Sequence, residues 1–274
     1  MCDSDVTLTG HHMKSASSSC FRWCFLVLFV LAGRLAGTSL AAQPAPLAAA
    51  HPQIDATAAG IMRQMSEYLG GLKAFSVHCV TSNEVRLTTG QKIQYLSAFD
   101  ATVRRPDGFH SRRLGLEQWQ FYYDGKTYAA YSVQANRYAT AQVPGGLDRV
   151  LDELQQRFGV ELPGSDLLYS NIFDGMMPQV TEALYLGPEE IEGVTTHHLA
   201  FRTPEVDWQI WIADGPQPLP YRYLITSKNE PGALQYCVEL SKWDTAPKID
   251  PASFVFTPPT GAKKVEFLPA AQPK

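Results

Sequence analysis

The chain has 274 residues, with 23 Lys and Arg against 27 Asp and Glu and a formal net charge of −4. This mildly acidic balance, without a run of basic residues, argues against nucleic acid as a partner, because binding to phosphates needs concentrated positive charge. The length suits one large domain or two small ones and allows a sizeable core to be buried.

The first 42 residues are predicted to be a secretory signal peptide. An apolar run over residues 23–33 follows Lys14 and Arg22, and the small residues after it suit cleavage near Ala41 or Ala42. The run is well short of the roughly 20 residues that a membrane-spanning helix needs. We therefore expect an exported, periplasmic protein with no transmembrane segment in its mature chain.

Two further features bear on this leader. Residues 1–12 are polar and contain two aspartates, which is unusual for a signal peptide, so we expect the true start at Met13. No cysteine directly follows the apolar run, so we expect no lipobox and no lipid anchor. Loss of residues 1–42 removes three basic and two acidic residues and leaves 20 against 25, a net charge of −5.

Residues 43–53 are a Pro- and Ala-rich linker without a packing pattern. Asp55 then offers an N-cap, and apolar residues recur at helical spacing after it. The pattern predicts an amphipathic helix over residues 56–69 that ends at Gly70 and Gly71. We expect its apolar stripe to pack on a sheet, because its polar face lacks the Lys and Arg cluster of a membrane-surface helix.

Short alternating segments over residues 75–140 predict an antiparallel meander. Asp124 and Gly125 give the strongest hairpin signal, since this pair readily takes the positive φ angles of a tight turn. Pro106, Asp107 and Gly108 mark a second turn.

Helical spacing returns over residues 146–158, and Gly159 is expected to end that helix. The apolar, turn-rich stretch 162–180 follows and predicts one or two short helices with irregular connections. Because it stands between two runs of strands, we expect it to cover the sheet as a lid. The predicted lid residues are Leu167, Leu168, Tyr169, Ile172 and Phe173.

Strands then return, with turn residues between them. The predicted strands cover residues 183–186, 194–202, 208–213, 221–227 and 234–243, with a short end around 254–256. This order of elements, with little room for parallel crossovers, predicts an α+β domain over residues 54–267 on a single antiparallel sheet. Residues 268–274 are expected to be a disordered tail.

The stretch "EGVTTHHLAFRTPEVDWQIWI" places His197 beside His198. Successive side chains of a strand point to opposite faces, so the two imidazoles cannot easily meet at one metal ion. The sequence contains no helical His-Glu-x-x-His arrangement, nucleophile elbow, phosphate loop or dinucleotide fingerprint. We therefore expect no metal, no cofactor and no enzymatic activity, and a hydrolase that uses either histidine is the weaker alternative.

Cys79 and Cys237 are the cysteines that remain after loss of the leader. In an oxidising compartment they could form a disulfide if the fold brings them together. Two separate buried thiols are an equal alternative, because the sequence alone does not place two strands side by side.

Aromatic and large apolar residues are spread over most of the predicted strands. One interpretation is a plain core between sheet and helices, since aromatic side chains bury large areas. The sharper interpretation is a strongly curved sheet that leaves an apolar cavity along its concave face. The residues predicted to line that cavity and bind a ligand are Trp119, Phe121, Tyr123, Leu199, Phe201, Trp208, Ile210 and Tyr223.

Several segments also carry a resemblance to a known family. "MSEYLGGLKAFSV", "RRPDGFHSRR", "FYYDGKTYAAYSVQANRYA", "ELPGSDLLYS" and "PLPYRYLITSK" stand in this order within residues 53–267. Together they resemble the family of predicted periplasmic proteins catalogued as domain of unknown function 2092, which has no assigned activity. That family's pattern is similar in turn to the superfamily of the periplasmic lipoprotein carrier, its receptor, and the sensor that binds an anti-sigma factor.

The resemblance implies an N-terminal helix, an unclosed antiparallel half-barrel, and a helical lid over an apolar cavity on the concave side. It also implies a protein that binds a lipid or lipoprotein acyl chain, or another lipophilic ligand, as a carrier or chaperone for envelope components. The alternative is a module that docks an envelope protein partner or senses stress without a small ligand. In the carriers an arginine on the concave face helps to hold the lid, and Arg104, Arg105, Arg112 and Arg113 lie in that region of this chain.

Overall fold

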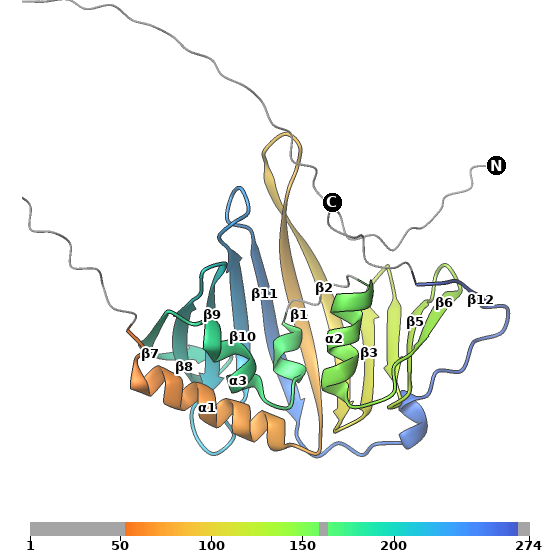
Figure 1. Cartoon of the computed structure of the whole chain (residues 1–274), viewed down its shortest axis with the longest axis horizontal. Coiled ribbons are helices and arrows are strands. Elements are labelled where there is room, and N and C mark those ends of the chain that lie inside the picture. Colours follow the sequence, from red (N-terminus) through yellow and green to blue (C-terminus); the bar gives the residue numbers. More distant parts are fainter. Residues whose placement is uncertain (1–52, 159–163, 268–274) are drawn as a thin grey trace, which may run out of the picture. The chain divides into compact units, whose positions relative to one another are not determined.

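A computed structural model of the chain describes residues 53–158 and 164–267. The predicted signal peptide, nearly all of the linker, Gly159 and the predicted tail lie outside this part, so what was expected of them stays a prediction. The described residues form one sheet with helices on one of its faces (Figure 1). None of the helices among them is long and apolar enough to cross a membrane.

The sheet has twelve strands in the order β12-β6-β5-β4-β3-β2-β1-β11-β10-β9-β8-β7. Their bounds are β1 (Ala74–Arg86), β2 (Lys92–Arg104), β3 (Gly108–Leu114), β4 (Trp119–Tyr123), β5 (Thr127–Ser132), β6 (Arg137–Gln142), β7 (Glu182–Ile191), β8 (Val194–Arg202), β9 (Val206–Ala213), β10 (Pro220–Ser227), β11 (Gln235–Asp244) and β12 (Lys263–Lys264). Neighbouring strands are antiparallel except for the short pair β12 and β6. Within the described residues the end strands β12 and β7 do not pair with each other, so the sheet curves around its helices without closing. The predicted α+β fold on one unclosed sheet is confirmed, apart from that parallel pair.

Strands β1 to β6 are the predicted meander, with each strand paired to the next. The predicted hairpin at Asp124 and Gly125 joins β4 to β5, and Gly125 has a φ of 90°. The Asp124 carboxylate accepts hydrogen bonds from the amides of Lys126 and Thr127 at 2.9 and 2.7 Å. This turn sets the register that decides which side chains of β4 and β5 share a face.

The second run of strands follows the predictions closely. β8 has the predicted bounds, and β9, β10 and β11 begin and end within two residues of theirs. β7 continues to Ile191, past the predicted end at Leu186, through a bulge between Tyr185 and Gly187. A bulge re-aims the strand without ending its pairing, and alternation of apolar residues does not reveal it.

The strand predicted at residues 254–256 is wrong. Pro251–Phe254 is a short 3-10 helix, η3, and the last strand is β12 further on. Proline favours the first turn of a helix, and the Asp250 carboxylate caps this one by accepting a hydrogen bond from the Ala252 amide at 2.9 Å.

Helix α1 (Ala56–Gly71) begins at the predicted cap. The Asp55 carboxylate accepts hydrogen bonds from the amides of Thr57 and Ala58 at 2.7 and 3.2 Å. The predicted end at the glycine pair is two residues too early, because both glycines are helical and the chain leaves the helix at Leu72 in an extended conformation. The buried residues of α1 are Ala58, Met62, Met65, Ser66 and Leu69.

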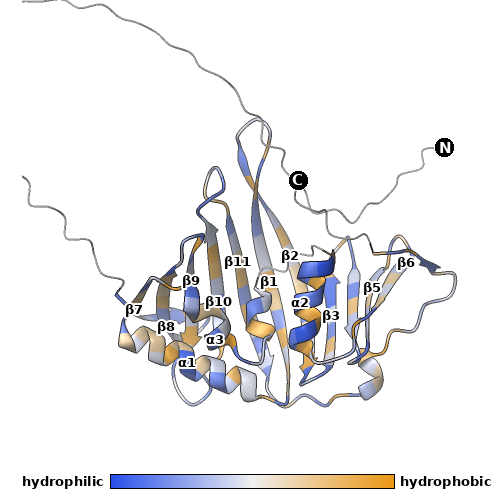
Figure 2. Ribbon diagram, viewed as in Figure 1, coloured by the Kyte–Doolittle hydropathy of each residue, from blue (hydrophilic) through white to orange (hydrophobic). Residues whose placement is uncertain are grey.

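The remaining helices stand between the two runs of strands. α2 (Leu147–Phe158) starts one residue after the predicted position and turns its apolar side toward the sheet (Figure 2). Where one or two short helices were predicted, the structure has three: η1 (Ser165–Leu168), α3 (Ile172–Met176) and η2 (Met177–Gln179). They lie on the same face of the sheet as α1, and α3 contacts α1 directly (Figure 1). We call residues 165–179 the lid, and the face of the sheet that carries α1, α2 and the lid the concave face.

Candidate functional site

The residues predicted to line a cavity lie on one face of the sheet. Cross-strand partners share a face, and Leu199 pairs with Ile210 while Phe201 pairs with Trp208. Ile210 pairs in turn with Tyr223. On β4, Trp119, Phe121 and Tyr123 alternate along the strand, and every predicted lining residue either belongs to the hydrophobic core under the helices or packs against it. All eight side chains therefore lie on the concave face.

Most of that predicted lining is packed with the protein's own side chains. The buried members are Tyr123, Leu199, Phe201, Trp208, Ile210 and Tyr223, in one core with Met62, Met65 and Leu69 of α1 and Leu167 and Ile172 of the lid. Trp119 and Phe121 are half-buried. In this state a ligand fits against the buried group only if the lid or α1 moves, whereas Trp119 and Phe121 are partly accessible.

The five predicted lid residues lie between the solvent and the core of the concave face. Leu167 and Ile172 are buried against the core, and Leu168, Tyr169 and Phe173 are half-buried around them. The Arg63 guanidinium of α1 lies 3.9 Å from the centre of the Phe173 ring.

Arg105 connects the end of β2 to the lid through two hydrogen bonds. Its Nη1 donates to the Leu168 carbonyl at 2.8 Å and its Nη2 to the Tyr169 carbonyl at 3.2 Å. Burial lowers the pKa of the Arg105 guanidinium from its ordinary value, and Nε is buried without a partner among the described residues. Of the four arginines named from the sequence, the structure brings this one to the lid, while the other three contact carboxylates or a hydroxyl elsewhere.

A few further hydrogen bonds tie the lid to the helices on either side. The Ser170 amide donates to Asp148 of α2 at 3.0 Å, and the Tyr169 hydroxyl donates to Asp152 of the same helix at 2.8 Å. The Phe173 amide donates to Ser66 Oγ of α1 at 2.8 Å. The lid is thus held by polar contacts at its rim and by apolar side chains beneath it. Leu167 and Ile172 are buried, and Leu168, Phe173, Met176 and Met177 are partly buried against the core.

One acidic residue of the lid faces the sheet. The Tyr223 hydroxyl donates to Asp166 Oδ2 at 3.4 Å. Burial raises the pKa of the Asp166 carboxyl above its ordinary value, and the Tyr223 hydrogen bond opposes part of that rise. No sequence pattern singled out this pair, because Asp166 also reads as an ordinary residue of a polar turn.

The histidine pair divides between the two faces, as alternation predicted. His197 Nδ1 lies 3.1 Å from the Tyr185 hydroxyl and its Nε2 lies 3.2 Å from Asp214. His198 is on the other face, with Nδ1 2.9 Å from Glu189 and its ring stacked on Trp211. Within residues 53–158 and 164–267, no three His, Cys, Asp or Glu side chains gather closely enough to hold a metal ion.

The two cysteines are free thiols in the described part of the chain. Cys79 is opposite Leu240 and Cys237 is opposite Ser82, so an offset of three residues puts the two thiols on opposite faces of β1 and β11. The disulfide held open from the sequence is therefore absent from this structure, and the alternative of separate thiols is found. Burial raises the pKa of the Cys79 thiol to about 12.

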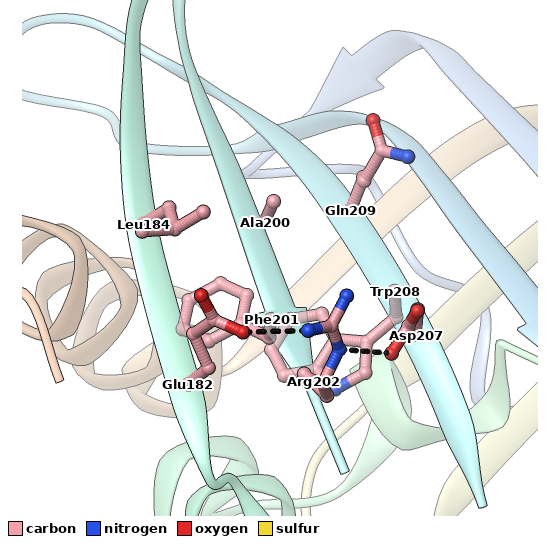
Figure 3. A pocket seen from close by; sticks show the side chains of 8 residues that line it. All are labelled: Glu182, Leu184, Ala200, Phe201, Arg202, Asp207, Trp208 and Gln209. Atoms are coloured by element: carbon pink, nitrogen blue, oxygen red, sulfur yellow. Dashed lines mark hydrogen bonds and ion pairs between the residues drawn. The ribbon is translucent and has the colours of Figure 1, made fainter. Parts of the chain in front are cut away.

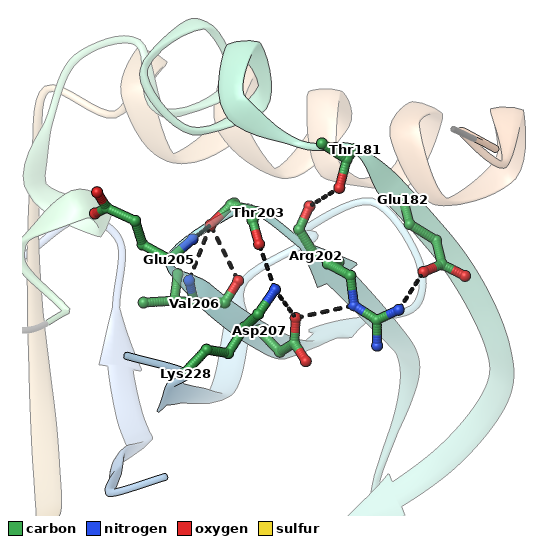
Figure 4. Close-up of polar contacts among 8 residues, drawn as sticks. All are labelled: Thr181, Glu182, Arg202, Thr203, Glu205, Val206, Asp207 and Lys228. Atoms are coloured by element: carbon green, nitrogen blue, oxygen red, sulfur yellow. Dashed lines mark hydrogen bonds and ion pairs between the residues drawn. The ribbon is translucent and has the colours of Figure 1, made fainter. Parts of the chain in front are cut away.

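A small hollow of about 170 Å³ lies on the outer face of β7 to β9. Its walls are Glu182, Leu184, Ala200, Phe201, Arg202, Asp207, Trp208 and Gln209 (Figure 3). Arg202 crosses it, 2.8 Å from Glu182 and 3.1 Å from Asp207. Lys228 extends this ion-pair network at its edge, 3.4 Å from Asp207 (Figure 4). Ligand pockets usually have volumes of about 300 Å³ or more, so this hollow is too small for an acyl chain.

Comparison with known proteins gives the following results. A family model described as "Predicted periplasmic protein (DUF2092)" matches residues 58–268. None of the curated proteins compared with the chain matches it. Among solved structures it is similar to the lipoprotein LppX of Mycobacterium tuberculosis, at 17% identity and a TM-score of 0.46, over 72% of this chain and 100% of that one.

Two further structures are similar over comparable lengths. LprF of Mycobacterium bovis has 17% identity and a TM-score of 0.44, over 76% of this chain and 99% of that one. A LolA superfamily protein of Nitrosomonas europaea has 10% identity and a TM-score of 0.34, over 73% of this chain and 97% of that one. Likenesses at these values carry no inference about function.

Proposed function

This chain belongs to the DUF2092 family of predicted periplasmic proteins, and we propose that it binds a lipid acyl chain or another lipophilic ligand on its concave face, without covalent chemistry. In this role it is exported by the leader and serves as a carrier or chaperone for envelope components. The observation that carries the proposal is the lid. A separate helical segment, tied by polar contacts at its rim and packed through its apolar side chains, covers part of a strip of aromatic side chains on one face of an unclosed sheet. The strip consists of Trp119, Phe121, Tyr123, Phe201, Trp208 and Tyr223.

Burial of apolar surface drives the proposed binding. A chain of about fifteen methylenes contributes about 12 kcal/mol before the cost of association, at about 0.8 kcal/mol for each buried methylene. Uncovering the Leu167 and Ile172 side chains costs about 2 to 3 kcal/mol each, and the partly buried Leu168, Phe173, Met176 and Met177 add to this cost. Burial of a long acyl chain therefore offsets much more of the cost of displacing the lid than burial of a short one.

Entry begins in this proposal at Trp119 and Phe121, where the concave face is partly accessible. The lid then moves as its ties to Arg105, Asp148 and Ser66 break, and the ligand takes the place of Leu167 and Ile172 against the buried aromatic residues. The protein's residues only bind and release, so no acid, base or nucleophile is required of them.

A fluorescence titration tests the proposal. N-phenyl-1-naphthylamine, an uncharged apolar dye, should bind the purified mature protein, and palmitate should displace it. Phe121→Asp should weaken dye binding about tenfold or more, because it puts a charge into the proposed apolar strip. Gln120→Ala is the matched control, since Gln120 precedes Phe121 and points to the outer face.

Native mass spectrometry of protein purified from the periplasm supplies the second readout. A co-purified acyl compound supports the proposal. A protein that leaves cells without lipid and binds neither dye nor palmitate contradicts it.

A protein-docking function is the second candidate, and the β1–β2 hairpin favours it. β2 pairs with β3 only from Ala98 onward, so the outer part of the hairpin extends beyond its neighbour (Figure 1). On that part Tyr95 is 60% and Leu96 is 69% exposed. A membrane-protein partner recovered by the wild type and lost with Tyr95→Ser/Leu96→Ser, while dye binding is unchanged, would support docking in addition to or in place of ligand binding.

A further inference from the structure

On strands β2 to β4, burial on the concave face fades in successive rows of cross-strand neighbours. The deepest row contains Val103 and Tyr123, which are buried, and Phe109, which is half-buried. In the next row Phe121 is half-buried between Ser111 and Ala130, which are buried. A chain inserted along this face therefore has its apolar end in the deepest row and its polar end toward the rows where side chains become accessible.

Arg113 stands in the third row, where this change takes place. It pairs with Phe99 on β2. On β4 the residue opposite it is Trp119, because the preceding pair joins Arg112 to Gln120. All three side chains are partly accessible, and that of Arg113 is 31% exposed. A guanidinium is thus placed on the concave face itself, between two aromatic side chains that belong to the accessible end of the strip.

The contacts of Arg113 leave it able to take another anion. Nη2 donates to Ser97 Oγ at 3.0 Å, and Nη1 lies 3.4 Å from the carboxylate of Glu117, whose side chain is 77% exposed. An exposed ion pair of this length contributes little, because water screens it. A carboxylate or phosphate oxygen can replace Glu117 and receive the parallel hydrogen bonds that a guanidinium donates to such groups.

We propose that the lipophilic ligand carries an anionic head group, a carboxylate or a phosphate, and that Arg113 binds this head group while the acyl chain lies against Trp119 and Phe121. The inference rests on the proposed function and deepens it, since it names the chemical class of the ligand. The chain as a whole is acidic, with a net charge of −4, so it does not attract anions in general. A preference for anionic ligands would therefore have to come from a single cation at the binding site, and Arg113 is placed there.

Two ligands with the same chain and different head groups test the proposal. Laurate and dodecanol each compete with N-phenyl-1-naphthylamine on the mature protein at about pH 8, where the carboxylate of laurate is ionised. Laurate should displace the dye about tenfold more effectively than dodecanol, because only laurate gains a charge-assisted hydrogen bond.

Arg113→Gln should remove this preference and leave dye binding and dodecanol competition unchanged. Arg112→Gln is the matched control, because Arg112 is the preceding residue, points to the outer face and pairs with Asp100 at 3.1 Å. It should keep the wild-type preference for laurate. Acetate and inorganic phosphate should not compete, since they have no chain to bury.

The possible outcomes distinguish failure of the head-group inference from failure of the proposed function. If the dye does not bind the wild type, both the proposed function and the inference are wrong. If the dye binds but laurate and dodecanol compete equally, or Arg113→Gln keeps the preference, the head-group inference is wrong and the proposed function stands. Competition by acetate or phosphate alone would show a site for small anions and would also overturn the inference.

Discussion

Arg105 and Arg104 are consecutive residues with different surroundings. Arg105 donates to the Leu168 and Tyr169 carbonyls of the lid, at 2.8 and 3.2 Å. Arg104 pairs with Asp107 at 2.9 Å and lies over the Phe254 ring, away from the lid. The two therefore offer a direct comparison of an arginine that holds the lid with one that does not.

Arg105→Met should loosen the lid. It removes both hydrogen bonds and leaves two lid carbonyls without that donor, which should lower the free energy of unfolding by about 2 kcal/mol. The bound dye should also exchange about tenfold faster, since the lid opens more readily. Urea unfolding and stopped-flow dye release measure these effects, with Arg104→Met as the control; equal release rates in the two variants would refute a lid-holding role for Arg105.

Asp166 predicts a dependence of stability on pH. Burial raises the pKa of its carboxyl in the folded protein above the unfolded value. The folded state therefore takes up a proton first as the pH falls, and the carboxyl's unfavourable burial is relieved between the folded and unfolded pKa values. Relative to wild type, Asp166→Asn should be more stable at neutral pH, and this advantage should shrink as the pH falls toward about 4. Urea midpoints across this range measure the difference; an advantage that grows on acidification would contradict the argument.

Alternation along strands explains why side-chain placement was predictable. Which face a residue takes is a local property of a strand, so the eight lining residues and the division of His197 from His198 follow from the sequence. Whether a lining residue meets a ligand or a neighbouring side chain is not local. The contact of Arg105 with Leu168 joins residues 63 apart in the chain, and no pattern in the sequence distinguishes it from the other three arginines.

At the scale of elements, the close approach of the lid to α1 depends on one glycine. A Cβ added at Gly70 would lie 2.3 Å from the Ser170 carbonyl oxygen, which is backbone and cannot simply rotate away. The continuation of α1 through Gly70 thus brings the helix against the lid.

Gly70→Ala should displace the lid, because the new methyl group cannot fit while Ser170 keeps its place. Dye exchange should become faster and the free energy of unfolding should fall, despite the better helix propensity of alanine. Gly60→Ala is the control, since a Cβ there meets nothing within 4 Å, and it should stabilise the protein by about 0.5 to 1 kcal/mol. Stabilisation by both substitutions, with unchanged dye exchange, would show that the lid does not depend on this contact.

Elements with strong periodicity were predictable, and short ones were not. Helices α1 and α2 and strands β8 to β11 follow the pattern of apolar residues to within two residues. The strand predicted at residues 254–256 does not form, because Phe254 ends a 3-10 helix that a proline and the Asp250 cap begin, and Val255 and Phe256 follow without regular structure. The bulge in β7 likewise has no signal in the alternation of its residues.

At the scale of the whole molecule, the unclosed sheet and its lid form a cover over a strip of aromatic side chains. The strip is closed by Leu167 and Ile172 at one end and is partly accessible at Trp119 and Phe121. The proposed function requires that an acyl chain reaches this strip. An acyl chain bound elsewhere on the protein, for example on the β1–β2 hairpin, would leave the lid without a function in binding.

Quenching of tryptophan fluorescence by stearate that carries bromine atoms on its chain tests this requirement most directly, because bromine quenches an indole only at short range. Trp119 lies on the concave face beside the proposed chain, and Trp211 lies on the outer face, stacked on His198. If the acyl chain lies on the concave face, the wild type should be strongly quenched. The quenching should be clearly weaker in Trp119→Phe, where Trp208 remains as the second lining tryptophan, and should be unchanged in Trp211→Phe. Quenching that is the same in Trp119→Phe as in the wild type, or that disappears with Trp211→Phe, would place the chain off the concave face and would refute the proposed function.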